Sequence, residues 1–200
     1  MKRLHDKKID DANFYNKIWE REYKKGNMVF DAVRQRALIE PVKNGDFIID
    51  VGAGLFGPAQ YIAEKTDIKP RVTVWYDQSK VASDIVKERV GEKTFWHVIG
   101  PCEHIFFAPN YFDVVVAGEI IEHMEEPDKF AKELIRVCKP GGTVVVSTVN
   151  TKCENAIKHG DYPDHLWEFE PEDLINFFRP YGETEYRTVG DYHFIYFRKP

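Results

Sequence analysis

A short apolar run that ends in a glycine loop constrains the fold of this chain most strongly. Residues 46–54 read DFIIDVGAG, and residues 57–67 have the pattern of a helix with Pro58 in its first turn. Proline is well tolerated there because the first turn does not use its missing N–H. An apolar run of this length bounded by glycines is typical of a buried parallel strand. The segment therefore predicts a strand, a tight turn and a helix.

The same alternation continues to the C-terminus. Strands are expected at 71–77, 94–100, 112–119 and 143–149, and helices at 79–90, around 130–138 and at 171–182. Residues 183–189 and 191–199 surround a Gly190-Asp191 turn and predict an antiparallel hairpin. Alternating strands and helices predict an α/β fold, a mostly parallel sheet with helices on both faces. No linker divides residues 1–200, so we expect a single domain.

Two helices are expected in residues 1–40. The first helix is expected to begin at an N-cap at Asp11, to end at Gly26-Asn27, and to have an apolar face of Phe14, Ile18 and Trp19 near Tyr23. The second helix is expected to have an apolar stripe of Phe30, Val33, Ala37 and Leu38. These helices would cover part of the sheet.

Composition excludes several classes of protein. With 28 Lys and Arg against 33 Asp and Glu, the net charge of −5 disfavours a nucleic-acid partner. No apolar run approaches the roughly 18 residues of a membrane span, so no membrane partner is expected. The three cysteines form no CxxC, and the N-terminus lacks a signal-peptide core, which together favour the cytoplasm. A monomer or homodimer is expected.

The glycine loop is compatible with two kinds of cofactor. Gly52, Gly54 and Gly57 satisfy the GxGxxG pattern of dinucleotide enzymes, and Asp77 follows twenty residues after Gly57. Asp50, at the strand end, would repel a pyrophosphate. It would attract the ammonium and hydroxyl groups of a sulfonium amino-acid cofactor, which the sequence therefore favours.

Longer segments carry a resemblance. IIDVGAG resembles the first motif of class I S-adenosylmethionine-dependent methyltransferases, and FDVVVAGEIIEHMEEP and KELIRVCKPGGTVVVSTVN resemble their fourth- and fifth-strand signatures. The similarity covers roughly residues 45–150, and HLWEFEPEDLINFF is similar to the stretch that follows. It implies a Rossmann-like, seven-stranded sheet over 45–200, S-adenosylmethionine as cofactor, and an N-terminal helical lid over 1–40. Tyr15, Trp19 and Tyr23 are candidates for that lid.

The resemblance also implies cofactor-binding positions. They are Asp50, Gly52, Ala53, Gly54, Asp77, Gln78, Cys102, Glu103 and Glu119. Asp77 would accept both ribose hydroxyls, since an ionised acceptor suits a diol. Two positions depart from the family pattern. Pro101 replaces an adenine-binding Asp, so Glu103 or a backbone carbonyl would substitute, and Phe56 stands where the third glycine is usual.

The cluster E-x-x-E-H allows three interpretations. If Glu119, Glu122 and His123 form a helix, they share one face. His123 could bond only backbone; His123 or His165, with Glu122, could act as the base for an acceptor that loses a proton. These residues could also hold a metal, a pattern that resembles the small-RNA 3′-terminal 2′-O-methyltransferases.

We expect catalysis by a histidine without a metal, on an oxygen or nitrogen of a small-molecule acceptor. The alternatives are a metal-dependent RNA 2′-O-methyltransferase and a non-catalytic cofactor-binding subunit. A nicotinamide oxidoreductase is disfavoured by Asp50 and the closing hairpin.

Overall fold

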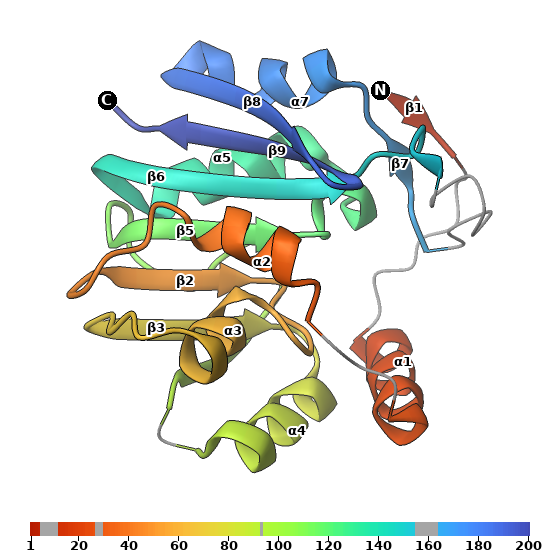
Figure 1. Cartoon of the computed structure of the whole chain (residues 1–200). Coiled ribbons are helices and arrows are strands. Elements are labelled where there is room, and N and C mark those ends of the chain that lie inside the picture. Colours follow the sequence, from red (N-terminus) through yellow and green to blue (C-terminus); the bar gives the residue numbers. More distant parts are fainter. Residues whose placement is uncertain (5–11, 27–29, 93, 155–163) are drawn as a thin grey trace.

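The computed structural model describes residues 1–4, 12–26, 30–92, 94–154 and 164–200. Its main sheet has seven strands in the order β4-β3-β2-β5-β6-β9-β8 (Figure 1). They are β2 (Phe47–Val51), β3 (Val72–Asp77), β4 (Trp96–Ile99), β5 (Phe112–Gly118), β6 (Cys138–Val149), β8 (Glu183–Val189) and β9 (Tyr192–Arg198). The five neighbouring strands β4, β3, β2, β5 and β6 pair in parallel, and β9 is antiparallel to both β6 and β8. The predicted sheet and closing hairpin are confirmed.

Helices cover both faces of this sheet (Figure 1). They are α2 (Ala32–Ile39), α3 (Pro58–Lys65), α4 (Lys80–Val90), α5 (Pro127–Val137) and α7 (Pro171–Phe178). Helix α1 (Ala12–Lys25) instead lies beyond the carboxyl ends of the strands, beside α4 (Figure 1). Two 3₁₀ turns, η1 (Ile121–His123) and η2 (Arg179–Tyr181), complete the described helical elements. Ile48 packs in a cluster with Leu38 of α2, whereas its neighbour Ile49 packs in a cluster with Phe130 of α5. Successive strand residues face opposite sides, so an all-apolar strand is buried by helices on both.

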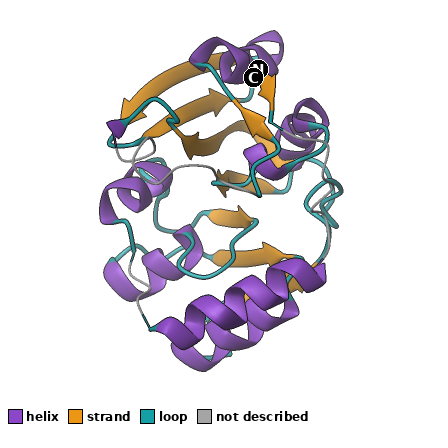
Figure 2. Cartoon of the chain, turned by 90° about the vertical axis from the view of Figure 1, so that its right-hand side faces the viewer, coloured by secondary structure: helices purple, strands orange, loops and turns teal. Residues whose placement is uncertain are grey.

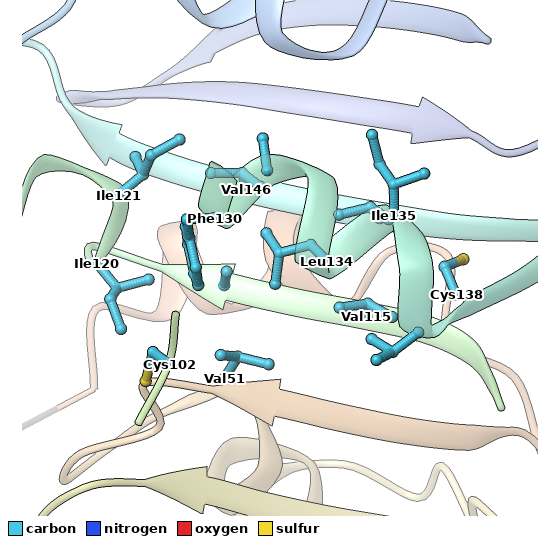
Figure 3. Close-up of a cluster of buried hydrophobic side chains, with 14 of the residues drawn as sticks. Val51, Cys102, Val115, Ile120, Ile121, Phe130, Leu134, Ile135, Cys138 and Val146 are labelled. Carbon is cyan, nitrogen blue, oxygen red and sulfur yellow. The ribbon is translucent and has the colours of Figure 1, made fainter. Parts of the chain in front are cut away.

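The largest core cluster lies between the sheet and α5 (Figure 3). Phe130 and Leu134 of α5 are fully buried against Val115 of β5 and Val146 of β6. The predicted helical spacing of this stretch is confirmed. Burial of side chains of this size contributes roughly 1.5–3 kcal/mol each, which fixes the strands whose ends carry the site.

Local signals fix several element ends as predicted. The Ser79 hydroxyl accepts a hydrogen bond from the Ala82 N–H at 3.1 Å and caps α4. Pro58 occupies the first turn of α3. Gly190, with φ of +58°, makes the turn between β8 and β9.

Three expectations about secondary structure were wrong, and two lie outside the described residues. Strand β6 begins at Cys138, five residues before the expected start, because Cys138 already pairs with Phe112 of β5. Glu119 does not share a helix with Glu122 and His123. Its backbone N–H is still bonded to the Ser147 carbonyl of β6 at 3.0 Å, so only η1 follows. Val33 is 55% exposed and does not join the apolar stripe of α2. The expected cap at Asp11 and end at Asn27 lie outside the described residues.

A small ribbon lies beside the main sheet and was not predicted. Strand β1 (Lys2–Arg3) pairs antiparallel with β7 (Trp167–Glu168). Among the described helices, no span has the length and apolar character required to cross a membrane.

Candidate active site

A cavity of about 120 Å³ lies at the carboxyl ends of the parallel strands, the end of the sheet that faces the viewer in Figure 2. Its walls are Tyr15, Ile18, Trp19, Gly52, Asp77, Gln78, Cys102, Glu103, Glu119, Ile120, His123, Met124 and Asp164. In the sheet, β3 lies on one side of β2 and β5 lies on the other. The loops therefore diverge at this point, which is where open α/β sheets bind ligands.

The glycine loop borders this cavity, and Gly52 is part of its wall. Gly52 has φ of +69°, and a Cβ there would lie 2.0 Å from Cδ1 of Ile120. Gly54 has φ of +46°, and a Cβ there would lie 2.6 Å from the Trp19 ring. Both positions thus require glycine, for backbone conformation as well as for space.

Asp77 ties this loop to the end of β3. Its Oδ2 accepts from the Gly54 N–H at 2.9 Å and its Oδ1 from the Ser79 N–H at 2.7 Å. Burial raises the pKa of Asp77 to about 6. Each carboxylate oxygen can accept more than one hydrogen bond, so the group can still bind a ligand in the cavity.

Asp50 lies behind the loop rather than in the cavity wall. It is buried, and its Oδ2 accepts from the Ala59 N–H in the first turn of α3 at 2.9 Å. Its Oδ1 has no hydrogen-bond partner among the described residues. Burial raises the pKa of Asp50 to about 7.

The structure brings most of the predicted site residues together. Those in the wall are Gly52, Asp77, Gln78, Cys102, Glu103, Glu119 and His123, while Asp50, Ala53, Gly54, Glu122 and His165 are outside the lining. Of the lid candidates, Tyr15 and Trp19 line the cavity, and Tyr23 is 45% exposed away from it. The sequence analysis missed Ile120, Met124 and Asp164. Only the apolar run 120–121 after β5 could have indicated the first of these.

Two buried glutamates follow β5. Glu119 accepts a hydrogen bond from the Ser147 hydroxyl at 2.8 Å, and burial raises its pKa to about 8, with a further contribution from Glu122. Glu122 is 1% exposed, and burial raises its pKa to about 7. Neither Glu122 oxygen makes a hydrogen bond of normal geometry to a described residue, although the nearby Thr148 hydroxyl lowers its pKa.

Two histidines lie next to these acids. His123 Nδ1 is 2.8 Å from the Asp164 backbone carbonyl. A carbonyl can only accept, so Nδ1 donates, and Nε2 of the neutral ring remains an acceptor. The His165 ring lies 4.9 Å away and perpendicular, and its Nε2 is 3.9 Å from Glu122 Oε1. Burial lowers the pKa of His165 to about 4, with His123 adding to the effect, so its ring is neutral at pH 7.

Comparison with known proteins places this geometry in a family. Residues 49–146 match the family model described as "Methyltransferase domain". Norajmaline N-methyltransferase of Rauvolfia serpentina is 28% identical over 121 residues, which are 60% of this chain and 41% of that protein. The chloroplastic tocopherol O-methyltransferase of Arabidopsis thaliana is 31% identical over 123 residues, 60% of this chain and 34% of that protein. The chain thus spans less than half the length of these relatives.

The fold matches a methyltransferase solved in complex with the Haloferax volcanii Trm112 methyltransferase activator. The TM-score is 0.75 at 14% identity, over 93% of this chain and 97% of that one. Fold and glycine-loop site together define a methyltransferase domain. Residues 49–146 match a methyltransferase domain, and the chain has the fold of solved S-adenosylmethionine-dependent methyltransferases. S-adenosylmethionine is the cofactor of this family.

The residues present fit this cofactor. Gly52 leaves part of the cavity wall without a side chain, and the Asp77 carboxylate at the wall suits a ribose diol. The orphaned Oδ1 of Asp50 is a buried acceptor without a protein donor among the described residues. Such a group is expected to be satisfied by water or by a ligand.

Proposed function

We propose that this chain transfers a methyl group from S-adenosylmethionine to an oxygen or nitrogen of a small-molecule acceptor in this cavity. The observation that carries the proposal is that one cavity unites Gly52 and Asp77 with the His123 imidazole. When bound, the cofactor supplies a methyl group activated on a sulfonium. The protein then has to align the acceptor, exclude water and take a proton. The names of the curated relatives include both N- and O-methyltransferases.

The cofactor would lie across the loop after β2. In this proposal the backbone of Gly52, Ala53 and Gly54 passes beneath its methionine part. Asp77 and Gln78 hold the ribose. Cys102 and Glu103 flank the adenine, and Glu119 borders the methionine end. Asp50 lies behind the loop, where its Oδ2 accepts a hydrogen bond from the first turn of α3 and its unpaired Oδ1 is available to a water or to the cofactor.

His123 is the proposed general base. Its Nδ1–H is held by the Asp164 carbonyl, which fixes the tautomer that offers Nε2 as a proton acceptor. Tyr15 of α1 lies edge-on to this ring at 6.2 Å and borders the same cavity. His165 and Glu122 lie outside the lining and would position His123.

Alanine variants of the histidines test the base. His123→Ala should lower kcat by roughly 10²–10⁴-fold on any acceptor found by screening, the usual share of a positioned base. Its affinity for S-adenosylhomocysteine should be unchanged, and added imidazole should restore part of the rate. His104→Ala is the matched control, since His104 is 74% exposed. Full activity of His123→Ala would overturn the base role. A folded wild-type protein that binds S-adenosylmethionine but transfers no methyl group would favour a non-catalytic subunit.

A metal-dependent reaction is the second candidate. Glu122, His123 and His165 each offer a ligand atom, and these atoms lie within 4.8 Å of one another. Mixed imidazole and carboxylate ligands suit divalent transition metals. If a metal acts here, a chelator abolishes turnover and Glu122→Ala is as damaging as His123→Ala. The base proposal expects full activity in chelator and no stoichiometric metal by elemental analysis of the purified protein.

A further inference from the structure

Arg34 of α2 has a buried donor without a partner. Its Nε is shielded from solvent and has no acceptor among the described residues. The guanidinium carbon lies 5.1 Å from the centroid of the Tyr192 ring, at the start of β9. The helix start is itself well capped, since Asp31 accepts from the Arg34 backbone N–H at 3.0 Å. A buried donor of a charged group that stays unpaired is costly, so a partner from outside the chain is indicated.

The surroundings of Arg34 place it beside the cofactor region. Helix α2 packs over β2, β5 and β6, through Leu38 against Ile48 and Val145. The positive charge of Arg34 offsets a small part of the rise that burial causes in the pKa values of Asp50, Glu119 and Glu122. Asp50 lies near the end of β2 and Glu119 follows β5. Tyr192, which lies under the guanidinium, pairs with Val149, the last residue of β6, so Arg34 lies at the carboxyl end of the sheet, just outside the lining of the cavity.

The orphaned groups here have opposite charges. Arg34 Nε lacks an acceptor, and Asp50 Oδ1 lacks a donor. A phosphate group would meet three carboxyl groups for one guanidinium. A zwitterion instead brings an anion for Arg34 and an ammonium that can donate hydrogen bonds to the neighbouring carboxyl oxygens. The charge pattern thus matches an α-amino acid better than a pyrophosphate.

We propose that Arg34 binds the α-carboxylate of the methionine moiety of S-adenosylmethionine. The planar guanidinium can donate two parallel hydrogen bonds to a carboxylate, which a lysine cannot do. Stacking on Tyr192 would hold the guanidinium plane in place. This inference rests on the proposed function, because it assigns one part of the same cofactor.

Paired ligands test the assignment without turnover. S-adenosylhomocysteine carries the amino-acid part, whereas 5′-methylthioadenosine keeps the nucleoside and sulfur and lacks it. In calorimetric titrations, Arg34→Met should weaken S-adenosylhomocysteine roughly 10–100-fold, as expected for hydrogen bonds to a charged partner. The same variant should bind 5′-methylthioadenosine like wild type. Arg34→Lys should fall in between, since it keeps the charge and loses the planar fork.

Arg36→Met is the matched control, because Arg36 lies on the same helix and donates a hydrogen bond to the Tyr61 hydroxyl, whereas the Nε of Arg34 has no acceptor among the described residues. It should bind both ligands like wild type. Equal losses for both ligands in Arg34→Met would mean a structural role and overturn the proposal, as would unchanged S-adenosylhomocysteine binding. If Arg34→Met fails to fold in thermal unfolding, Arg34→Lys decides by the same comparison. Wild type that binds neither ligand would overturn the proposed function itself.

Discussion

Glu119 and Glu122 hold protons at pH values where an exposed glutamate has lost them. Burial raises their pKa values to about 8 and about 7, from an ordinary 4.5. The folded state therefore binds these protons more tightly than the unfolded state. The resulting stability is fully present below pH 4.5 and is lost as pH rises through 7 to 8. His165, with its lowered pKa, acts in the opposite direction, but only between about pH 4 and 6.5.

Glu122→Gln should flatten the pH dependence of stability in the ligand-free protein. Glutamine mimics the protonated carboxyl, so the variant loses one titration whose effect on stability falls between about pH 4.5 and 7. The fall in unfolding free energy over this range should be shallower by up to about 1.4 kcal/mol per pH unit. Denaturant unfolding at several pH values measures it, with exposed Glu172→Gln as control. Parallel pH curves for Glu122→Gln and wild type would mean that this carboxyl is ionised throughout.

Helix α1 forms one wall of the cavity. It has no fully buried residue, yet Tyr15, Ile18 and Trp19 line the cavity. Asn16 holds it to α4: its Oδ1 accepts from the Ser79 hydroxyl at 2.7 Å and from the Val81 N–H at 3.2 Å. A helix without a buried residue is expected to open locally. This agrees with the lid predicted for residues 1–40, which stays a prediction.

Asn16→Ala should release this helix. Two hydrogen bonds of about 0.5–1.5 kcal/mol each would be lost, so residues 12–25 should exchange amide hydrogens faster and S-adenosylhomocysteine should dissociate severalfold faster. Hydrogen exchange by mass spectrometry and stopped-flow dissociation measure the two effects. Exposed Lys17→Ala on the same helix is the control. If saturating S-adenosylhomocysteine gives residues 12–25 of wild type no protection, α1 is not a lid.

Elements were predictable where one local pattern decides them. Helices cover both faces of β5, and the continuous apolar run from Val114 to Ala117 predicts this burial from the sequence alone. The turn at Glu119, with φ of +56°, was not predictable, because it is held by a hydrogen bond from the Glu119 N–H to the Ser147 carbonyl of β6. The two-residue strands β1 and β7 are too short to leave a periodic signal.

Across the whole molecule, the site is assembled from segments that lie far apart in the sequence. Gly52 and Asp77 were predictable, since strand ends meet at one sheet edge. The orphaned Nε of Arg34 was not, because it depends on how α2 packs and on which carboxyls it then faces. The hydrogen bond between His123 and the Asp164 carbonyl was likewise not predictable, because the two residues are far apart in the sequence and meet only in the folded chain. Patterns along the sequence thus identify the cofactor loop, whereas tertiary packing sets the charge balance around it.

The most direct measurement is a calorimetric titration of the purified chain with S-adenosylhomocysteine, with NAD in parallel and Asp77→Ala as the variant. We expect a complex of one S-adenosylhomocysteine per chain and no NAD binding. Asp77→Ala, shown to be folded by its thermal unfolding, should bind more weakly by roughly 1.5–3 kcal/mol, because hydrogen bonds to a charged acceptor are lost. Binding of NAD in place of S-adenosylhomocysteine, or equal affinity of wild type and Asp77→Ala, would contradict the account.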